Sequence, residues 1–506
     1  MMNTYPKDIQ LTINEDNYWC GMGKQDLSFH QVMGELVDNC ISATQIDEDG
    51  DMEPFKIEIA IEKISDKIII DIIDNGRGMS EEELIQNVFS PGGRGKSNGI
   101  LNEHGFGLKN SLCVLTKGNK LNWNIITRDY QALENEIIYQ VKGPFSSNIN
   151  LGLTDINNMI KNGFFKINNT GTRVNVETTY KYFCTVYNRG KLFSTLIERF
   201  IEHLGVMYRS YLRSKHNKLI VRWKETLDTS SKWESVRVRP IEIYYDYDGN
   251  SEYEIDVQGN EGIAKAKYRV GKLDKEKTVA GDGEKPYPLK IYYQGNQQTQ
   301  GVDLVVRGRV VKSSVLEAIW KTQPHNSMNK FVGEIILDDT RFRTINNKLG
   351  LDPNNDYTIN LLEELETDTK YKVEKVTKSK TEEVLKKDFE IRLKGMFTGC
   401  SVQRERPIMT GSGVKVDVYL KESNNDITIY EFKVAVAAPI DVYQLLMYWD
   451  GVVKDEKQSP KKGRLVANEI PEAVRNIIND INQRLDGLGN KYNLEGKTIE
   501  EMGLEK

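Results

Sequence analysis

Several side chains near the N-terminal end of the chain have the types and spacing needed to build a nucleotide site. Glu35 and Asn39 lie one helical turn apart, so their side chains share the edge of one helix face. Asp74 ends an isoleucine-rich run and precedes Gly76 and Gly78. An asparagine carbonyl suits Mg²⁺, a glutamate can polarise a water for attack on a phosphate, and a carboxylate can accept from the exocyclic amine of adenine. These residues therefore predict a Mg²⁺, a water and an adenine placed beside one another.

The elements expected to position these residues are an amphipathic helix and two strands. Apolar residues recur at helical spacing over 29–41, and Ser28 with Gln31 gives a capping-box start. Residues 57–61 alternate as in a half-exposed strand, and 68–73 are typical of a central strand. Each pattern alone also fits an ordinary half-buried helix or a turn.

A glycine-rich stretch at 91–97 and 104–111 adds a second part of the expected site. Gly105 and Gly107 precede an apolar run that can start a helix, where backbone N–H groups form an anion site. Lys109 adds a positive charge for phosphate. The stretch therefore predicts phosphate binding.

The end of the first glycine segment imitates a P-loop, but the resemblance is rejected. Ser90 occupies the position of the first P-loop glycine, and neither a preceding strand nor a clear following helix is indicated. Residues 91–107 are instead interpreted as a mobile lid. Further along, 169–176 reads as a Gly-Thr turn entering a strand, where the Thr172 hydroxyl could assist Asp74 through a water.

In this order the motifs resemble the GHKL ATPases, the superfamily of gyrase B, Hsp90, histidine kinases and MutL, and the MORC and MutL-like branch looks closest. The resemblance spans about residues 20–365 and implies a Bergerat α/β sandwich that uses ATP and Mg²⁺. It implies that Glu35 is the general base, Asn39 the Mg²⁺ ligand and Asp74 the adenine reader. The further nucleotide-binding positions that it implies are Gly76, Gly78, Met79, Gly92, Gly93, Gly105, Phe106, Gly107, Lys109 and Thr172.

Length and composition indicate a multidomain protein of ordinary polarity. At 506 residues the chain exceeds a single core, and 39% hydrophobic with 28% charged residues is typical of globular proteins. The polar start gives no signal peptide, no apolar run approaches the ~20 residues of a membrane span, and the five cysteines lack metal-site spacing. We therefore expect a cytoplasmic protein without a zinc site or membrane contact. The net charge of −5 leaves nucleic-acid binding to local patches.

The middle of the chain is expected to form a second α/β domain. A helix is predicted over 192–212, followed by a basic run that fits either a solvated face or a phosphate-contacting surface. Strands are predicted at 240–245, 264–269, 288–293 and 302–306.

Three segments of this region, 307–313, 331–337 and 345–348, resemble the S5-like transducer domain of MORC and MutL proteins. The resemblance implies that Lys348 reaches the γ-phosphate of ATP from the second domain. The alternative is a surface lysine in an asparagine-rich turn.

A different set of charged residues follows the charge-rich segment 361–387. Residues 414–420 and 427–434 are predicted to form paired strands, which can bring Asp417 beside Glu431 and Lys433. Two carboxylates there could bind Mg²⁺ while the lysine holds or activates a water. A helix is predicted at 443–449, and another near Glu390 offers a further acid.

This set resembles the PD-(D/E)xK nucleases. The resemblance implies Asp417, Glu431 and Lys433 as the core, with Asp417 and Glu431 binding Mg²⁺, and Glu390 and Gln444 as accessory positions. Val416 stands where the pattern has proline. The alternative is a β-hairpin with a surface ion pair.

The resulting expectation is a multidomain α/β protein with a GHKL ATPase domain (1–184), a transducer (185–365), a linker (366–386) and a nuclease domain (387–506). It would dimerise on ATP and control Mg²⁺-dependent cleavage of nucleic acid, with DNA as the expected target. The expected role is bacterial restriction or anti-phage defence, in which a partner protein could take part. The alternatives are an ATP-dependent DNA clamp without cleavage and an Hsp90-like chaperone.

Overall fold

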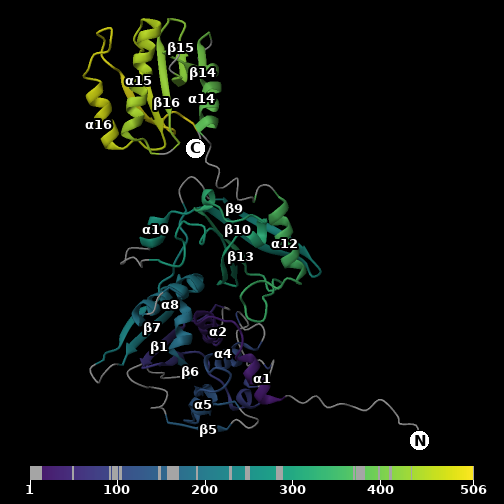
Figure 1. Ribbon diagram of the computed structural model, residues 1–506. Coiled ribbons are helices and arrows are strands. Elements are labelled where there is room, and N and C mark those ends of the chain that lie inside the picture. The colour runs from purple at the N-terminus through teal and green to yellow at the C-terminus, as the bar shows by residue number, and fades with distance from the viewer. Residues whose placement is uncertain are drawn as a thin grey trace. The chain divides into compact units, whose positions relative to one another are not determined.

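The computed structural model describes residues 14–47, 51–89, 93, 101, 105–145, 150–155, 170–189, 192–226, 231–245, 251–280, 289–368, 371, 382–396, 399–409, 413–434 and 436–504. The chain divides into two compact units, Met1–Val373 and Glu374–Lys506. Both contain mixed sheets and helices (Figure 1), so the multidomain α/β fold is confirmed.

A mixed sheet forms the first half of the N-terminal unit. Among the described residues it has the order β5-β4-β3-β6-β2-β1-β7-β8, with β1 parallel to β7 and the other pairs antiparallel. The strands are β1 (Lys56–Ile64), β2 (Lys67–Asp74), β3 (Trp123–Arg128), β4 (Tyr139–Lys142), β5 (Leu151–Leu153), β6 (Gly171–Thr179), β7 (Lys218–Glu225) and β8 (Glu234–Arg237).

The helices of this half include the one predicted to carry Glu35 and Asn39. They are α1 (Glu15–Met22), α2 (Phe29–Ser42), α3 (Glu81–Glu83), the π-helix η1 (Leu84–Val88), α4 (Gly107–Leu115), α5 (Tyr130–Glu134), α7 (Tyr180–Phe183), η2 (Cys184–Val186), α8 (Phe193–Met207) and α9 (Arg209–Leu212). The capping box of Ser28 and Gln31 starts α2 as the sequence predicts, with the Ser28 N–H donating to Gln31 Oε1 at 2.8 Å.

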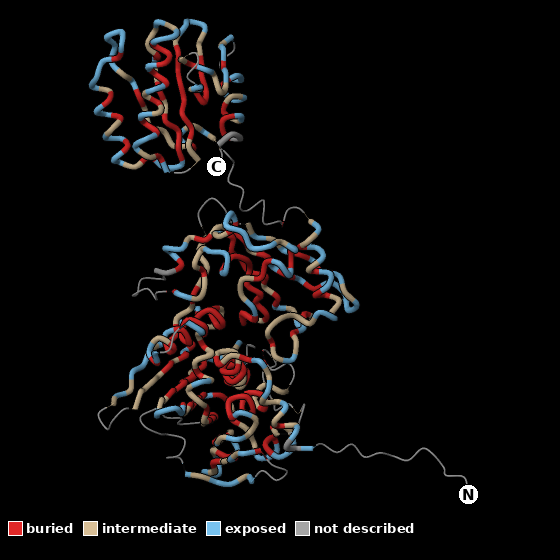
Figure 2. The backbone as a smooth tube through the Cα atoms, in the orientation of Figure 1, coloured by how far each residue is buried: buried red, intermediate tan, exposed pale blue. Residues whose placement is uncertain are grey.

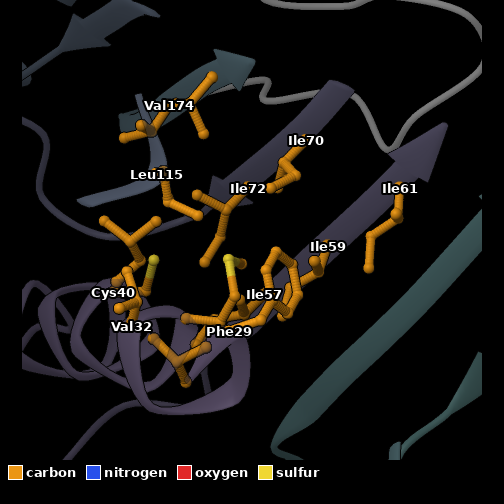
Figure 3. Close-up of a cluster of buried hydrophobic side chains, with 14 of the residues drawn as sticks. Phe29, Val32, Cys40, Ile57, Ile59, Ile61, Ile70, Ile72, Leu115 and Val174 are labelled. Carbon is orange, nitrogen blue, oxygen red and sulfur yellow. The ribbon is translucent and has the colours of Figure 1, made fainter. Parts of the chain in front are cut away.

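The apolar face of α2 packs on the isoleucines of β1 and β2. Figure 3 shows Phe29, Val32 and Cys40 of the helix turned toward Ile57 and Ile72 of the strands. The same core continues through α8 and β7 to Val238, past the boundary expected after residue 184. Packing of this face, more than helix propensity, fixes α2 against the sheet.

Strand β1 is less exposed than its alternation predicts. Residues 57–61 are all buried (red in Figure 2), because cross-strand ion pairs cover the charged face. Glu58 pairs with Arg222 of β7 at 3.1 Å, and Asp71 of β2 pairs with Arg173 of β6 at 2.6 Å. Charged residues can alternate in a buried strand when each meets a partner.

A second sheet, with described order β12-β11-β13-β10-β9, completes the N-terminal unit. Its strands are β9 (Ser251–Gly259), β10 (Gly262–Lys272), β11 (Gly301–Val306), β12 (Arg309–Val315) and β13 (Phe331–Leu337). The helices of this part are α10 (Lys275–Ala280), α11 (Glu317–Trp320), η3 (Asn326–Met328) and α12 (Asp356–Thr367).

Two of the four strands predicted for this region are wrong. The segments 264–269 and 302–306 lie in β10 and β11, but 240–245 and the described part of 288–293 form no strand. The backbone N–H groups of Lys290, Ile291 and Tyr292 donate to the buried carboxylate of Glu202 on α8. A side chain thus replaces the strand partner that the apolar pattern led us to expect.

The C-terminal unit is a three-layer α/β/α domain. Its sheet has the described order β14-β15-β16-β17-β18, antiparallel up to β16 and parallel from there. Helix α14 packs on one face, and α15 and α16 pack on the other. The elements are α14 (Glu382–Met396), β14 (Ser401–Pro407), β15 (Lys415–Lys421), β16 (Ile427–Phe432), α15 (Pro439–Glu456), β17 (Lys462–Ala467), α16 (Glu472–Ile481) and β18 (Leu494–Thr498).

Candidate functional site

A cavity opens between α2, the end of β2 and the start of α4. It encloses about 820 Å³, including its open mouth. The predicted nucleotide-binding residues that line it are Asn39, Asp74, Gly78, Met79, Gly93, Gly105, Gly107, Lys109 and Thr172. Gly92 and most of the expected lid, 91–107, lie outside the described residues.

Asp74 lies at the floor of this cavity, where β2 ends. The Gly76 N–H donates to its Oδ1 at 2.8 Å, and the Cys40 thiol and the Thr172 N–H also bond to the carboxylate. Burial outweighs these bonds and raises the pKa of Asp74 to about 6. The carboxylate is therefore ionised at neutral pH and can accept from an amine.

Thr172, which the sequence suggests could assist Asp74 through a water, lies beside Asp74 on the neighbouring strand. Its hydroxyl lies 2.9 Å from the Thr127 hydroxyl, which in turn accepts from the Met79 N–H at 2.9 Å. The backbone of Thr172 is paired with Asp74 across β6 and β2 and contacts the carboxylate. A strand pairing set this geometry, which a local turn motif could not indicate.

The glycines after Asp74 serve the packing of the protein backbone. A Cβ on Gly76 would lie 2.7 Å from the Ala43 carbonyl oxygen at the end of α2. Gly78 has a φ of +71°, and a Cβ there would lie 2.1 Å from the Arg128 carbonyl oxygen. These glycines thus bring the end of β2 against α2 and β3.

Asn39 and the start of α4 form the opposite wall. The Asn39 Nδ2 is buried without a hydrogen-bond partner among the described residues, so the amide has a donor to offer a ligand while its oxygen can bind a cation. Gly107 begins α4 directly after Phe106, and a Cβ on it would lie 2.8 Å from Glu35 Oε2. The start of α4 therefore lies close to the acid on α2, and the free N–H groups at a helix start can bind phosphate.

Lys109 is buried beside the cavity. Its ammonium donates to the carbonyl oxygens of Val88 at 2.8 Å and Gly93 at 3.3 Å. Burial lowers its pKa to about 8. Lys109 thus keeps a positive charge at neutral pH and links α4 to the glycine-rich segment.

Glu35 contacts two cations from the second half of the N-terminal unit, one from strand β12 and one from the loop after β13. Lys348 Nζ lies 3.2 Å from Glu35 Oε2, and Arg309 Nη1 lies 3.2 Å from Glu35 Oε1. Both cations also bind Asp38, one turn further along α2, with Lys348 at 2.9 Å. The Tyr208 hydroxyl completes this group by donating to Asp38 at 2.8 Å.

Asp38 and Arg309 were not identified as site residues from the sequence. Asp38 stands beside Asn39 and follows Glu35 by three residues, so its position on the same side of α2 could have indicated a role. Arg309 lies 274 residues from Glu35, and no local pattern links the two.

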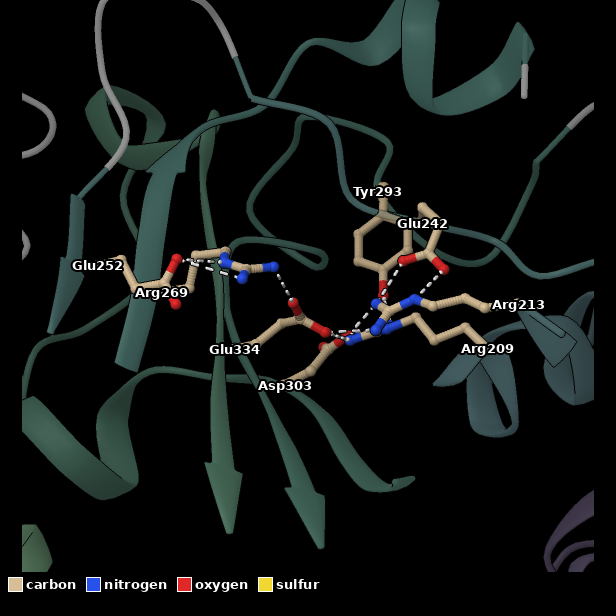
Figure 4. Close-up of polar contacts among 8 residues, drawn as sticks. All are labelled: Arg209, Arg213, Glu242, Glu252, Arg269, Tyr293, Asp303 and Glu334. Atoms are coloured by element: carbon tan, nitrogen blue, oxygen red, sulfur yellow. Dashed lines mark hydrogen bonds and ion pairs between the residues drawn. The ribbon is translucent and has the colours of Figure 1, made fainter. Parts of the chain in front are cut away.

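A buried ion network lies next to this group. Arg209 of α9 binds Asp303 of β11 at 2.9 Å and Glu334 of β13 at 2.7 Å, and Tyr293 donates to Asp303 at 2.5 Å (Figure 4). Arg209 is fully buried, so this member of the basic run is not a phosphate-contacting residue. It joins α9 to the second sheet at the residue after Tyr208.

The C-terminal unit brings its three predicted core residues together. Val418 of β15 pairs with Tyr430 of β16, and Asp417 and Glu431 are the next residues of the two strands. Lys433 Nζ lies 2.7 Å from Glu431 Oε1. Glu431 is fully buried, and its burial together with the nearby Asp417 raises its pKa. This buried acid pair differs from a hairpin carrying a surface ion pair.

The accessory positions have different surroundings. Gln444 Nε2 donates to the Tyr448 hydroxyl at 2.8 Å, and Tyr448 is close enough to Glu431 to lower the pKa of that acid. Glu390 instead pairs with Lys394 at 2.7 Å and Arg404 at 2.6 Å, and these partners lower its pKa. Gln444 therefore adjoins the acid pair through Tyr448, whereas Glu390 is engaged in ion pairs of its own.

Lys386 also contacts this pair of acids, and the sequence analysis did not identify it. Its Nζ lies 2.6 Å from Asp417 Oδ1, while the Phe432 N–H donates to Asp417 Oδ2 at 2.8 Å. Each of the two acids is thus paired with a lysine. A Mg²⁺ ion bound by Asp417 and Glu431 would replace these lysines as the positive charge beside the acids. Across the described residues, no group of three or more histidine, cysteine or acidic side chains is arranged for a metal.

Comparison with known proteins identifies part of the N-terminal unit. Residues 24–128 match the family described as histidine kinase-, DNA gyrase B-, and HSP90-like ATPase. The chain therefore contains a GHKL ATPase domain, which implies ATP binding and hydrolysis and usually Mg²⁺. No curated protein matches the chain.

A solved structure described as the crystal structure of the N-terminal domain of a DNA repair protein aligns with 69% of this chain and 95% of its own. The identity is 14% and the TM-score 0.39, too low to bear on fold or function. Within the described residues, every helix is too short or too polar to cross a membrane.

Proposed function

We propose that the protein is an ATP-switched GHKL machine of the MORC and MutL-like kind, in which nucleotide binding is sensed by a transducer domain and controls a Mg²⁺-dependent nuclease. In this proposal Glu35 is the general base, Asn39 binds Mg²⁺ and Asp74 accepts from the adenine amine. The start of α4, with Gly105, Gly107 and Lys109, holds the phosphates. Because GHKL ATPases commonly dimerise, ATP-dependent closure of two copies belongs to the same proposal.

The observation that carries the proposal is the contact between Lys348 and Glu35. The lysine belongs to the second sheet's part of the unit, and the acid lies on the helix that lines the nucleotide cavity. A γ-phosphate arriving at the cavity would offer Lys348 a stronger anionic partner than a single carboxylate. A contact between Lys348 and the γ-phosphate would exist only before hydrolysis. Its loss would therefore release the transducer.

The nuclease assignment rests on the acid cluster of the C-terminal unit. Bound Mg²⁺ would supply Lewis-acid activation of a phosphodiester and of a water. Asp417 and Glu431 are the acids that would hold it, and Lys433, 2.7 Å from Glu431, would hold or activate the water. DNA is the proposed target, and a role in restriction or anti-phage defence rests on family resemblance alone.

One experiment tests both halves and their connection. Plasmid DNA is incubated with the purified protein and Mg²⁺, with and without ATP, beside Glu35→Ala and Glu431→Ala. We expect ATP-dependent cleavage that both substitutions abolish. Cleavage that ignores both ATP and Glu35→Ala would separate the two activities, and cleavage that survives Glu431→Ala would refute the nuclease site.

A second candidate is an ATP-dependent DNA clamp that does not cut. The 2.6 Å contact between Lys386 and Asp417 favours it, because an ammonium on the carboxylate competes with a metal ion. ATP-dependent retention of circular DNA, with no cleavage at any Mg²⁺ concentration, would support the clamp.

A further inference from the structure

Two carboxylates and two cations form a buried cluster between helix α2 and the second sheet. Glu35 and Asp38 come from α2, Arg309 begins β12, and Lys348 lies in the loop between β13 and α12. The exposed fractions of these four side chains range from 0 to 8%. The cluster is formally neutral, as a group of charges buried this deeply must be.

We propose that Arg309 is a positioning residue for ATP hydrolysis, which neutralises Asp38 so that Lys348 can leave the cluster for the nucleotide. This inference rests on the proposed function of Lys348 at the γ-phosphate. It assigns a role to a residue that is not among those lining the nucleotide cavity. Arg309 acts through Asp38 and Lys348.

The surroundings of Arg309 hold it in place on α2. A Cβ on Gly34 would lie 2.9 Å from Arg309 Nη2 and 2.6 Å from Met207 Cε, so the helix has a glycine where the guanidinium passes. The Tyr208 hydroxyl lies 2.7 Å from the Gly34 carbonyl oxygen and 2.8 Å from Asp38 Oδ1, so two acceptors of α2 share its one proton. The guanidinium of Arg309 thus packs closely against the backbone of α2.

The two cations of the cluster differ in how firmly their backbones are held. Arg309 pairs with Val306 across the hairpin of β11 and β12, so its backbone belongs to a sheet. Lys348 lies in a turn with a φ of +52° and is held by a hydrogen bond to Ile345. A lysine carries its charge on a flexible stem, whereas the planar guanidinium of Arg309 contacts both carboxylates through one nitrogen, Nη1. Lys348 is therefore the cation suited to move, and Arg309 the one suited to stay.

The charge balance of the cluster explains why the movement of Lys348 to the nucleotide depends on Arg309. When Lys348 turns to a phosphate, Arg309 remains as the cation for both Glu35 and Asp38. Without Arg309, departure of Lys348 would leave two buried carboxylates without a cation from this cluster, which is strongly unfavourable. Loss of Arg309 should therefore hold Lys348 on the acids and slow hydrolysis while nucleotide binding changes little.

The test measures steady-state ATP hydrolysis and calorimetric ADP binding, with Mg²⁺, for Arg309→Gln and for Lys312→Gln as the matched control. Lys312 is an exposed cation on the same strand. We expect Arg309→Gln to lower kcat by about tenfold or more with the Kd for ADP within about threefold, and the control to match the unaltered protein. An unchanged kcat in Arg309→Gln would overturn the inference.

The double variant Arg309→Gln with Asp38→Asn separates positioning from a merely structural role. Removing the acid that Arg309 neutralises should restore part of the kcat lost in the single variant. A double variant as slow as or slower than Arg309→Gln would overturn the inference. If Arg309→Gln proves unfolded in a thermal melt, Arg309→Lys replaces it, with an intermediate kcat expected and an unchanged one contradicting the proposal. Absence of ATP hydrolysis in the unaltered protein would instead refute the proposed function itself.

Discussion

The ion cluster around Glu35 and the C-terminal acid cluster both pair carboxylates with cations, but these cations come from different parts of the fold. In the first cluster, Arg309 lies 274 residues from Glu35 and Lys348 lies 310 residues from Asp38, across the junction of two sheets. In the C-terminal unit, Asp417 and Glu431 lie on neighbouring strands. Lys433 follows β16 directly, and Lys386, which pairs with Asp417, comes from α14 of the same unit.

The origin of the cations decides how each site can change. A lysine supplied across a junction between two sheets can leave when the junction opens, whereas one supplied by the same sheet moves only as far as its own side chain. We therefore expect the charge around Glu35 to depend on the nucleotide state and that around Glu431 to stay constant. The predictions below test this difference, starting with the largest expected effect.

Glu35→Gln should abolish ATP hydrolysis while leaving nucleotide bound. A general base contributes about 10²–10⁴-fold, and the amide keeps the shape of the side chain. The measurements are kcat for ATP and the Kd for ADP, with Glu82→Gln as control, since Glu82 is an exposed acid in α3. Hydrolysis at more than a tenth of the normal rate would mean that another group is the base.

Lys433→Ala should reduce Mg²⁺-dependent cleavage of plasmid by about a hundredfold or more, because the lysine neighbours the buried acid and can position the water. The control is Lys454→Ala, an exposed lysine on α15. ATP hydrolysis should be unaffected in both. Intact cleavage of circular and linear DNA by Lys433→Ala would refute the assignment of the nuclease to this acid cluster.

Lys348→Met should lower kcat for ATP by about tenfold to a hundredfold, because a charged group that meets the reacting phosphate is lost. ADP affinity should stay the same, since ADP lacks the γ-phosphate. Lys330→Met, on another turn of the same sheet, provides the comparison. An equal loss of ADP affinity would place Lys348 away from the γ-phosphate and would weaken the contrast between the two regions.

Nucleotide affinity should follow a bell-shaped dependence on pH. Asp74, with its pKa raised to about 6, must be ionised to accept from adenine, so affinity falls as pH drops through 6. Lys109, with its pKa lowered to about 8, loses its charge as pH rises through 8, so affinity falls there too. The expected change is about tenfold per unit on each limb, measured as the Kd for ADP.

Two variants assign the limbs of that profile. Asp74→Asn should remove the acidic limb apart from the titration of the phosphate itself, and Lys109→Met should remove the alkaline limb. An alkaline limb that persists without Lys109 would mean that this lysine supports the glycine-rich segment and does not hold phosphate.

Local patterns predicted the elements that carry the site. The helical spacing over 29–41 and the capping box gave α2, and the isoleucine run gave β2 with Asp74 at its end. They failed where long-range partners decide, as at Glu202, whose carboxylate takes the N–H groups of a segment predicted as a strand. The burial of β1 was not predicted for the same reason, because Arg222, which pairs with Glu58, lies far along the chain from it.

The sequence by itself determined which acids stand on which elements, since helical and strand periodicities follow from the residues of each segment. Only the tertiary structure decided what faces those acids: Arg309 and Lys348 at Glu35, and Lys386 at Asp417. The physical reason is that a buried charge is stabilised by whichever opposite charge the fold brings within a few ångströms, and that distance is independent of separation along the chain.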